Sequence, residues 1–347
     1  MVASTALPRN PVLLLLLLSL SWTACGSSPK GEADPAVEQH FRETEQMRLE
    51  RNAKSQDFQK VLLDMDKAIS EYVTSVGQNE NEQAQRKVAA WGNWLVTNVT
   101  RYRAELRLLL QDPESARARQ IAAAALGFDR ANDKDQFTLG ALMAALQTEK
   151  SPEVKTNICT GIGIYASPLT PVDKLFDLVL DAREHLSVRQ AASWALLQVE
   201  MAGAPKEGFA RTWGMLLEGS PITRDPKLAL NAIQGIGLLR DPAQLTVLVP
   251  YLKEPVPLLQ QAACVAVSRL DNRKAAQYLI PLLGKIERNV NVKLYARKAL
   301  QDLAGEGVDH EYDWKAWAKY FHLVGDPEKG FQPEKAEKSA APEKSVP

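Results

Sequence analysis

One pattern of apolar, small and basic positions recurs between residues 98 and 305. Each copy begins at an apolar or small residue, called position zero, followed in most copies by a basic residue at position one. Small or apolar residues occupy positions four, seven and eight, which lie on one side of a helix at about 100° per residue. Successive copies are 36, 34, 40, 30 and 34 residues apart, with position zero at Ala118, Val154, Val188, Leu228, Leu258 and Val292.

A period of this length predicts one helical hairpin per repeat, with the patterned segment as its second helix. Before four of these helices, a polar residue and a proline favour a helix start, at Asp112-Pro113, Ser151-Pro152, Asp225-Pro226 and Glu254-Pro255. Shorter apolar segments predict the first helices, for example at residues 137–147, 173–182, 243–253 and 275–286. We therefore expect an all-α solenoid of about six hairpins.

Further helical patterns flank this array. Residues 58–97 predict two N-terminal helices, and apolar residues recur every three or four positions along the first of them, 58–76. Residues 306–324 predict a short helix that carries five aromatic residues. Because terminal repeats must cover an exposed apolar edge, we expect both segments to cap the array. The alternative for the C-terminal helix is an aromatic ligand box.

The outermost segments lack an apolar stripe. Residues 25–57 are polar and charged, which predicts a tether between the N-terminus and the folded part. Residues 325–347 repeat the sequence Pro-Glu-Lys and are expected to be disordered. Neither segment is expected to contribute to the core.

The repeated pattern resembles HEAT repeats of the variant also called PBS-lyase-like. The best match is NAIQGIGLLRDPAQLTVLVPYLKEP, residues 231–255, which contains a second helix, an Asp-Pro turn and the next first helix. The resemblance extends over about residues 98–305 and implies a helical solenoid. It does not imply one activity, because this architecture occurs in proteins of many functions.

The sequence Gly-Ile-Gly occurs twice and raises the question of phosphate binding. A dinucleotide-binding loop requires a preceding strand, and no strand pattern precedes either copy. In both copies the glycines fall at positions seven and nine of a second helix, at Gly161, Gly163, Gly235 and Gly237. We interpret all four as packing and helix-end glycines.

The N-terminus predicts export. Residues 1–24 contain Arg9 and an apolar run over 12–20, which is too short to span a bilayer. The following stretch, SWTACGSS, resembles a bacterial lipoprotein signal, in which the cysteine is diacylated and becomes the first residue of the mature protein. The resemblance implies lipidation of Cys25 and a membrane anchor. The alternative is an ordinary secretory peptide that is cleaved after Gly26.

Within this stretch Thr23, Ala24 and Cys25 match the lipoprotein pattern, whereas Trp22 departs from it, because a smaller aliphatic residue is usual there. Gly26, rather than an aspartate, follows the cysteine. In enteric-type sorting this favours the periplasmic face of the outer membrane.

Net charge and the placement of His and Cys argue against nucleic-acid binding, metal binding and catalysis. The chain has 42 basic and 42 acidic residues, so no overall field attracts nucleic acid, which we do not expect as a partner. Its four histidines lie at spacings unlike those of metal ligands, and no hydrolase motif is present. Cys159 and Cys264 lie on helices three repeats apart, so we expect both to be reduced and unpaired. We expect no enzyme, cofactor or metal site.

Positions two, five, six and nine of the second helices point away from the predicted packed face. These 24 residues include only two charges, although the average of the chain, 24% charged, predicts about six. In HEAT repeats such positions line the concave side, and we interpret them as a partner-binding groove formed by Gln120, Thr156, Gln190, Trp194, Leu230, Ile233, Gln234 and Gln260. Tight curvature of the array, or coverage by the helix 58–76, are the alternative explanations.

Together these features favour a membrane-anchored, non-enzymatic scaffold. We expect a monomeric array that binds a protein or peptide partner at the bacterial envelope. The alternative is an envelope enzyme or enzyme subunit, lyase-like, whose site the sequence does not display.

Overall fold

The computed structural model describes residues 35–76, 82–132, 136–217, 225–284 and 289–334. The expected signal peptide, with Cys25, lies outside the described residues. Residues 1–46 and 47–347 form two compact units, and each is described by itself. Among the described helices, none combines the length and apolar character that a bilayer crossing requires.

The segment expected as a polar tether contains a helix, α1 (Pro35–Ala53). Nearly all of its described side chains are exposed. The helix forms without an apolar stripe because the segment is rich in Glu, Gln and Arg, which favour helices, and has its one proline at the first position. The pattern of apolar residues alone therefore does not predict this helix.

Two helices precede the array, as predicted. α2 (Gln56–Val76) and α3 (Glu82–Arg101) pack against each other, and the apolar stripe of α2 is buried at Phe58, Leu62, Met65 and Ile69. α2 also contacts the second helix of the first hairpin, and the ring of Tyr72 meets that of Phe128, in the 3₁₀ segment after that helix (Gly127–Asn132), edge-on with centroids 5.0 Å apart. Coverage by this helix is thus confirmed for the first hairpin.

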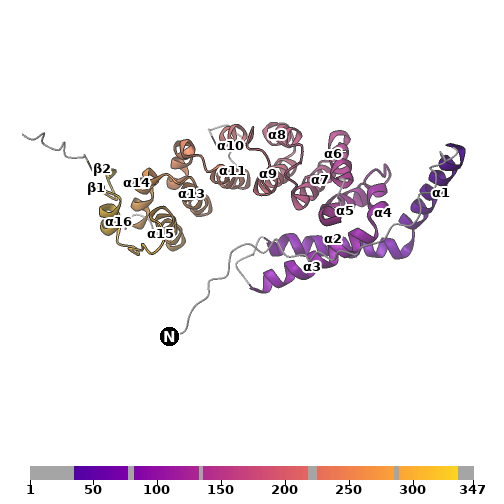
Figure 1. Ribbon diagram of the computed structural model, residues 1–347, viewed down its shortest axis with the longest axis horizontal. Coiled ribbons are helices and arrows are strands. Elements are labelled where there is room, and N and C mark those ends of the chain that lie inside the picture. The colour runs from indigo at the N-terminus through magenta and orange to yellow at the C-terminus, as the bar shows by residue number, and fades with distance from the viewer. Residues whose placement is uncertain (1–34, 77–81, 133–135, 218–224, 285–288, 335–347) are drawn as a thin grey trace, which may run out of the picture. The chain divides into compact units, whose positions relative to one another are not determined.

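Six helical hairpins follow, which confirms the predicted all-α solenoid. Their first helices are α4 (Arg103–Leu109), α6 (Phe137–Thr148), α8 (Asp173–Leu180), α10 (Phe209–Leu217), α12 (Leu245–Leu248) and α14 (Ala276–Leu279). Their second helices are α5 (Ala116–Leu126), α7 (Pro152–Tyr165), α9 (Leu186–Met201), α11 (Pro226–Leu239), α13 (Pro257–Arg269) and α15 (Val290–Ala304). Each second helix packs on the next one, and Figure 1 shows the first helices in a separate row above them.

The first helices of the last two hairpins are short for a local reason. α12 continues as a 3₁₀-helix over Val249–Lys253, and α14 continues as one over Ile280–Leu283. Each 3₁₀ segment has a proline at its second residue, Pro250 or Pro281. Proline lacks the backbone N–H of the α-helical pattern, so the chain changes to the tighter turn at these points.

The predicted packing register is confirmed in five second helices and wrong in α13. In those five helices, position zero is buried and lies three residues after the N-cap. In α13 the N-cap is Val256, so Leu259 takes position zero and is 5% exposed, whereas Leu258 is 53% exposed. The prediction used Pro255 as the helix start, but Pro257 occupies the first turn.

Glycines at positions seven and nine let the second helices approach each other closely. A Cβ on Gly127 would lie 2.6 Å from the carbonyl oxygen of Gly161, and one on Gly161 would overlap the carbonyl oxygen of Ala123. Likewise, a Cβ on Gly237 would lie 2.8 Å from Cα of Ala266. These glycines therefore serve helix packing, as predicted.

Gly161→Ala is expected to destabilise the protein by about 1–3 kcal/mol, because the added methyl meets backbone atoms of α5 that cannot rotate away. Gly140→Ala is the matched control, since Gly140 is an exposed residue of α6 with nothing within 4 Å of a new Cβ. That change should leave stability unaltered or raise it by up to about 1 kcal/mol. Urea denaturation measures both; equal effects would contradict the close approach.

The aromatic residues after the array pack on each other. α16 (Trp314–Tyr320) contacts the 3₁₀ segment after α14, and Trp317 is fully buried while its Nε1 donates to the carbonyl oxygen of Glu311. The rings of Phe321 and His310 lie 6.1 Å and 4.9 Å from that of Trp317. These side chains fill the end of the array instead of lining an open aromatic box.

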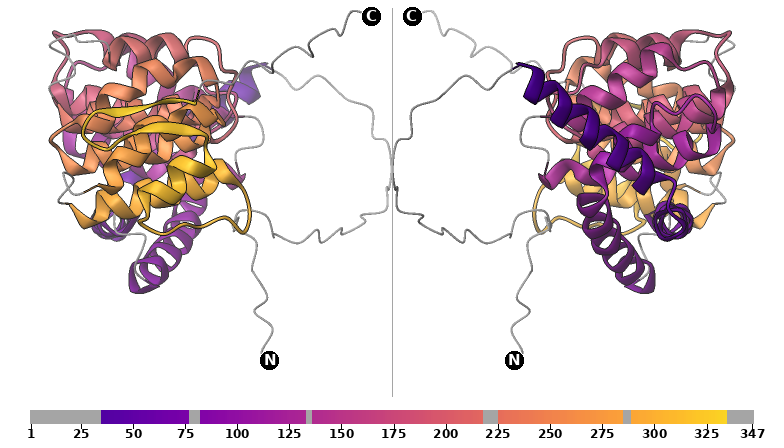
Figure 2. Two further views of the ribbon diagram at one scale, coloured as in Figure 1. Left: turned by 90° about the vertical axis from the view of Figure 1, so that its left-hand side faces the viewer. Right: turned by 90° about the vertical axis from the view of Figure 1, so that its right-hand side faces the viewer.

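The expectation of disorder from residue 325 onward is wrong for residues 325–334. β1 (Leu323–Asp326) and β2 (Gly330–Pro333) form an antiparallel hairpin beside α16 (Figure 2). Asp326 accepts hydrogen bonds from the backbone N–H groups of Glu328 and Lys329, and Gly330 adopts φ +88°. The turn residues D-P-E-K-G, 326–330, favour such a hairpin, although their charges resemble those of the Pro-Glu-Lys repeats that follow. Residues 335–347 lie outside the described residues.

Candidate functional site

Only half of the positions assigned to the groove reach the surface. Positions two and six are mostly half-buried, whereas position five is buried at Ala123, Cys159, Ser193, Ile233 and, in the corrected register, Cys264. Position nine is also buried in the first five repeats. The low charge at positions five and nine therefore follows from packing between hairpins, and Ile233 is not a groove residue.

Side chains at position one bind the first helix of their own hairpin. This role excludes a second residue, Gln260, from the predicted groove. Arg119 Nη1 donates to the carbonyl oxygen of Asp112, and Arg189 Nε donates to that of Val179, each at the end of the first helix of the same hairpin. In the corrected register Gln260 is also at position one, and its Nε2 donates to the carbonyl oxygen of Leu252 at 2.9 Å. Gln260 is buried, so its prediction as a groove residue is wrong.

Two polar candidates at position two connect neighbouring hairpins. Thr156 Oγ1 lies 2.9 Å from Ser187 Oγ in the first turn of α9. Gln190 Nε2 donates to Oδ2 of Asp225, the N-cap of α11, at 2.9 Å. Both side chains hold the start of the next second helix and are already engaged.

Two further predicted groove residues, Gln120 and Trp194, also contact other residues of the protein. Gln120 accepts a hydrogen bond from Arg117 on its own helix, next to α2. Trp194 is half-buried, and its indole ring occupies the space that a Cβ on Gly163 would need. Trp194 thus packs on the neighbouring helix α7 and is not a fully solvent-facing side chain.

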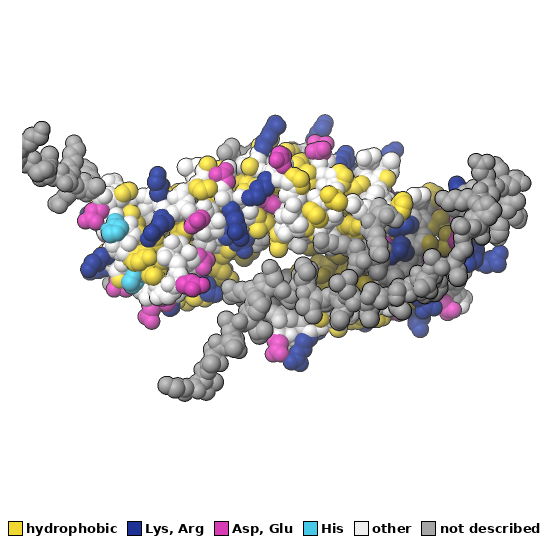
Figure 3. All heavy atoms as spheres, in the orientation of Figure 1, with side chains coloured by type: hydrophobic (Ala, Val, Ile, Leu, Met, Phe, Trp, Pro, Cys, Tyr) yellow, Lys and Arg dark blue, Asp and Glu magenta, His cyan; other side chains and the backbone are white. Residues whose placement is uncertain are grey.

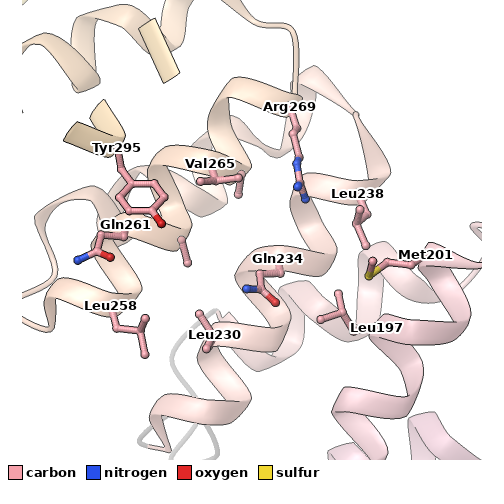
Figure 4. Close-up of a pocket in the computed structure, with 12 residues that line it drawn as sticks. Leu197, Met201, Leu230, Gln234, Leu238, Leu258, Gln261, Val265, Arg269 and Tyr295 are labelled. Atoms are coloured by element: carbon pink, nitrogen blue, oxygen red, sulfur yellow. The ribbon is translucent and has the colours of Figure 1, made fainter. Parts of the chain in front are cut away.

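Leu230 and Gln234, the remaining candidates, line a surface depression of about 370 Å³ between α9, α11, α13 and α15. Figure 4 shows Leu197, Leu238 and Met201 on one side of it, and Leu258, Gln261 and Tyr295 on the other. Met201 is 62% exposed and Leu258 is 53% exposed, although both are apolar. No hydrogen bond of the amides of Gln234 and Gln261 is found within the described part of the chain.

One of the lining residues stands where neighbouring helices have a glycine. At position nine, α7 and α11 have Gly163 and Gly237, whereas α9 has Leu197, a mostly buried residue that also lines the depression. Gln261 and Val265 are absent from the predicted groove because the predicted register of α13 is one residue off. In the corrected register these residues occupy positions two and six, which are the positions that the pattern predicts to face outward.

Uncharged residues occupy a recurring set of half-buried positions on three successive second helices, and some of them line the depression. The half-buried positions two, three, six and ten of α7, α9 and α11, called here the uncharged ridge, are Thr156, Asn157, Thr160, Ile164, Gln190, Ala191, Trp194, Gln198, Leu230, Asn231, Gln234 and Leu238. None of them is charged. By contrast, on the face seen in Figure 3, Lys and Arg side chains alternate with Asp and Glu, with no large area of one sign.

The described residues contain no group of three His, Cys, Asp or Glu side chains placed to hold a metal ion. Cys159 and Cys264 are buried on helices three hairpins apart and are not joined to each other, as predicted. Burial raises the pKa of the Cys159 thiol to about 12, which keeps it protonated and unreactive at neutral pH.

A buried carboxylate lies behind the depression on α9. Trp213 Nε1 donates to Oε2 of Glu200 at 2.9 Å, while Oε1 of Glu200 is buried without a hydrogen-bond partner among the described residues. Burial raises the pKa of Glu200 to about 7, against the opposite effects of the Trp213 hydrogen bond and the charge of Lys206. The ionised carboxylate therefore costs folding free energy at neutral pH.

Glu200→Gln is expected to gain stability relative to wild type as pH rises. In wild type, Glu200 of the unfolded chain releases its proton near pH 4.5, whereas Glu200 of the folded protein keeps it until about pH 7. The raised pKa of Glu200 therefore contributes fully to the unfolding free energy below pH 4.5, and this contribution is lost as pH rises to about 7. Because Gln stays neutral, the difference in unfolding free energy should grow by about 3 kcal/mol over this range. Urea denaturation at several pH values measures it.

Glu207→Gln, at an exposed position of the following loop, is the matched control. A difference between Glu200→Gln and wild type that stays constant with pH would contradict a raised pKa of the buried carboxyl group.

Comparison with known proteins supports the repeat architecture over part of the chain. Residues 219–302, which include the helices α11 to α14 and most of α15, match the family model described as HEAT repeats. A search of curated proteins gives no match. The matched segment contains three of the four helices that line the depression.

Proposed function

We propose that this HEAT-repeat protein is a membrane-anchored, non-enzymatic scaffold that binds a protein or peptide partner through the uncharged ridge and the adjoining depression. HEAT repeats commonly form helical scaffolds for protein interaction. The observation that carries the proposal is the exposure of two large apolar side chains, Met201 and Leu258, next to a surface without charges.

The chemistry of this surface fits a protein interface. Interface cores are depleted of charged residues, and large exposed apolar side chains next to polar amides are typical of sites that bind other proteins. The amides of Gln234 and Gln261 can each donate and accept hydrogen bonds, as the backbone of a bound segment requires. By comparison, Gln190 and Thr156 are held by the array itself.

The membrane anchor and the envelope location form a separate part of the proposal and rest on the N-terminal sequence. The apolar run over 12–20 and the stretch that ends at Cys25 support export and lipid attachment. The polar residues that follow would hold the array away from the membrane surface, with the periplasmic face of the outer membrane as the favoured location.

Leu258→Glu is expected to reduce partner capture at least tenfold, because it places a charge in the apolar part of the depression. The fold should be unaffected, since Leu258 lies in the first turn of α13, where an acidic residue is favourable. The measurement is crosslinking in the native envelope, with quantification of the proteins captured by wild type. Leu169→Glu, at a loop position that is 65% exposed, is the control and should retain capture.

Cys25→Ala is expected to release the array from the membrane. Two or more acyl chains hold a protein stably on a bilayer, so the wild-type protein should stay in the membrane fraction through salt and carbonate washes. Mass spectrometry of the wild-type N-terminus should find Cys25 as the first residue with added lipid. A mature protein that is unmodified and begins at Ser27 would contradict the anchor.

A further inference from the structure

Arg269 is the one charged residue among the described residues that line the depression. Arg269 lies in the last turn of α13, and its guanidinium points toward the depression in Figure 4. Throughout the described part of the chain, no ion pair or side-chain hydrogen bond of Arg269 is found. In contrast, Arg103, Arg119 and Arg297 are each paired with a carboxylate.

The helix α13 arranges the lining residues in a row. Gln261, Val265 and Arg269 follow each other at intervals of four residues, so they lie along one face, about 6 Å apart for each turn. Leu258 lies at the other end of the same helix, about 16 Å from Arg269 along its axis. A partner that lies along α13 thus meets apolar side chains and an amide first, and a cation at the end.

We propose that the depression binds an acidic amphipathic segment of a partner protein. An apolar side chain would enter between Leu230, Leu258 and Val265, while an Asp or Glu of the same segment binds the guanidinium of Arg269. This inference rests on the proposed function and specifies its partner. Arg269 is exposed and accessible to such a segment, and arginine binds carboxylates through two parallel hydrogen bonds.

Charge complementarity distinguishes this partner from a basic or uncharged one. Among the described residues, no acidic side chain lines the depression, so a lysine or arginine of a bound segment would face Arg269 without a counterion there. An arginine near the end of a helix also interacts favourably with the helix dipole, which accounts for a cation at this place. It does not account for an unpaired guanidinium directed over an apolar surface.

Selection from a library of random 16-residue peptides, displayed on phage, tests the proposal. The full-length protein is the bait, and peptides that also bind the Leu258→Glu variant are removed. The retained peptides should be enriched in Asp or Glu within three helical turns of Leu, Ile, Met or Phe. Retained peptides without an acidic excess, or the recovery of no peptide that depends on Leu258, would overturn the inference.

Arg269→Gln provides an independent readout with one selected peptide. Loss of a hydrogen-bonded charge pair should weaken binding at least tenfold in fluorescence anisotropy, and changing the acidic residue of the peptide to its amide should have the same effect without adding to it. Arg211→Gln, an exposed arginine of α10, is the matched control and should leave affinity unchanged. Equal affinities for both variants and wild type would overturn the role of Arg269.

The two proposals can fail separately. If capture in the envelope depends on Leu258 but the selected peptides carry no acidic excess, the scaffold function stands and the acidic partner is excluded. If capture does not depend on Leu258, the proposed binding surface itself is wrong.

Discussion

The close approach of successive second helices is the constraint on which the rest of this structure depends. Where Gly127 and Gly161 face each other, no space remains for a Cβ, so the two backbones themselves form the contact. A repeat array has only nearest-neighbour interfaces, and each of them must be well packed for the array to persist. Small residues at positions five, seven and nine meet this requirement along most of the chain.

This constraint also decides which positions remain for function. Positions five and nine are buried in the contact between hairpins, which leaves positions two, three, six and ten at the surface of α7, α9 and α11. At position nine of α9 the recurring glycine is replaced by Leu197, which is one of the residues that line the depression. The candidate site thus lies where the small-residue pattern is interrupted.

The sequence predicted the solenoid because burial imposes the same period on every hairpin. It predicted the site less well, because a face of low charge has two physical causes, packing and partner binding, which a helical wheel does not separate. Ile233 and Gln260 illustrate the first cause, whereas Leu230 and Gln234 line the depression at the surface, where we propose the second. The register error in α13 arose from two prolines two residues apart, and the C-terminal hairpin was missed because its turn residues lie in a charged segment.

Hydrogen bonds within the array separate polar side chains that stabilise the fold from those that can bind a partner. Arg189 satisfies a carbonyl at the end of α8, and Gln190 binds the N-cap of α11, so both are explained by the stability of the array. Burying such groups without partners would cost free energy, which is why the fold recruits them at fixed positions. For Gln234 and Arg269 no such role is found among the described residues. Their chemistry is therefore available to a bound partner, and they lie beside the most exposed apolar side chains of α9 and α13.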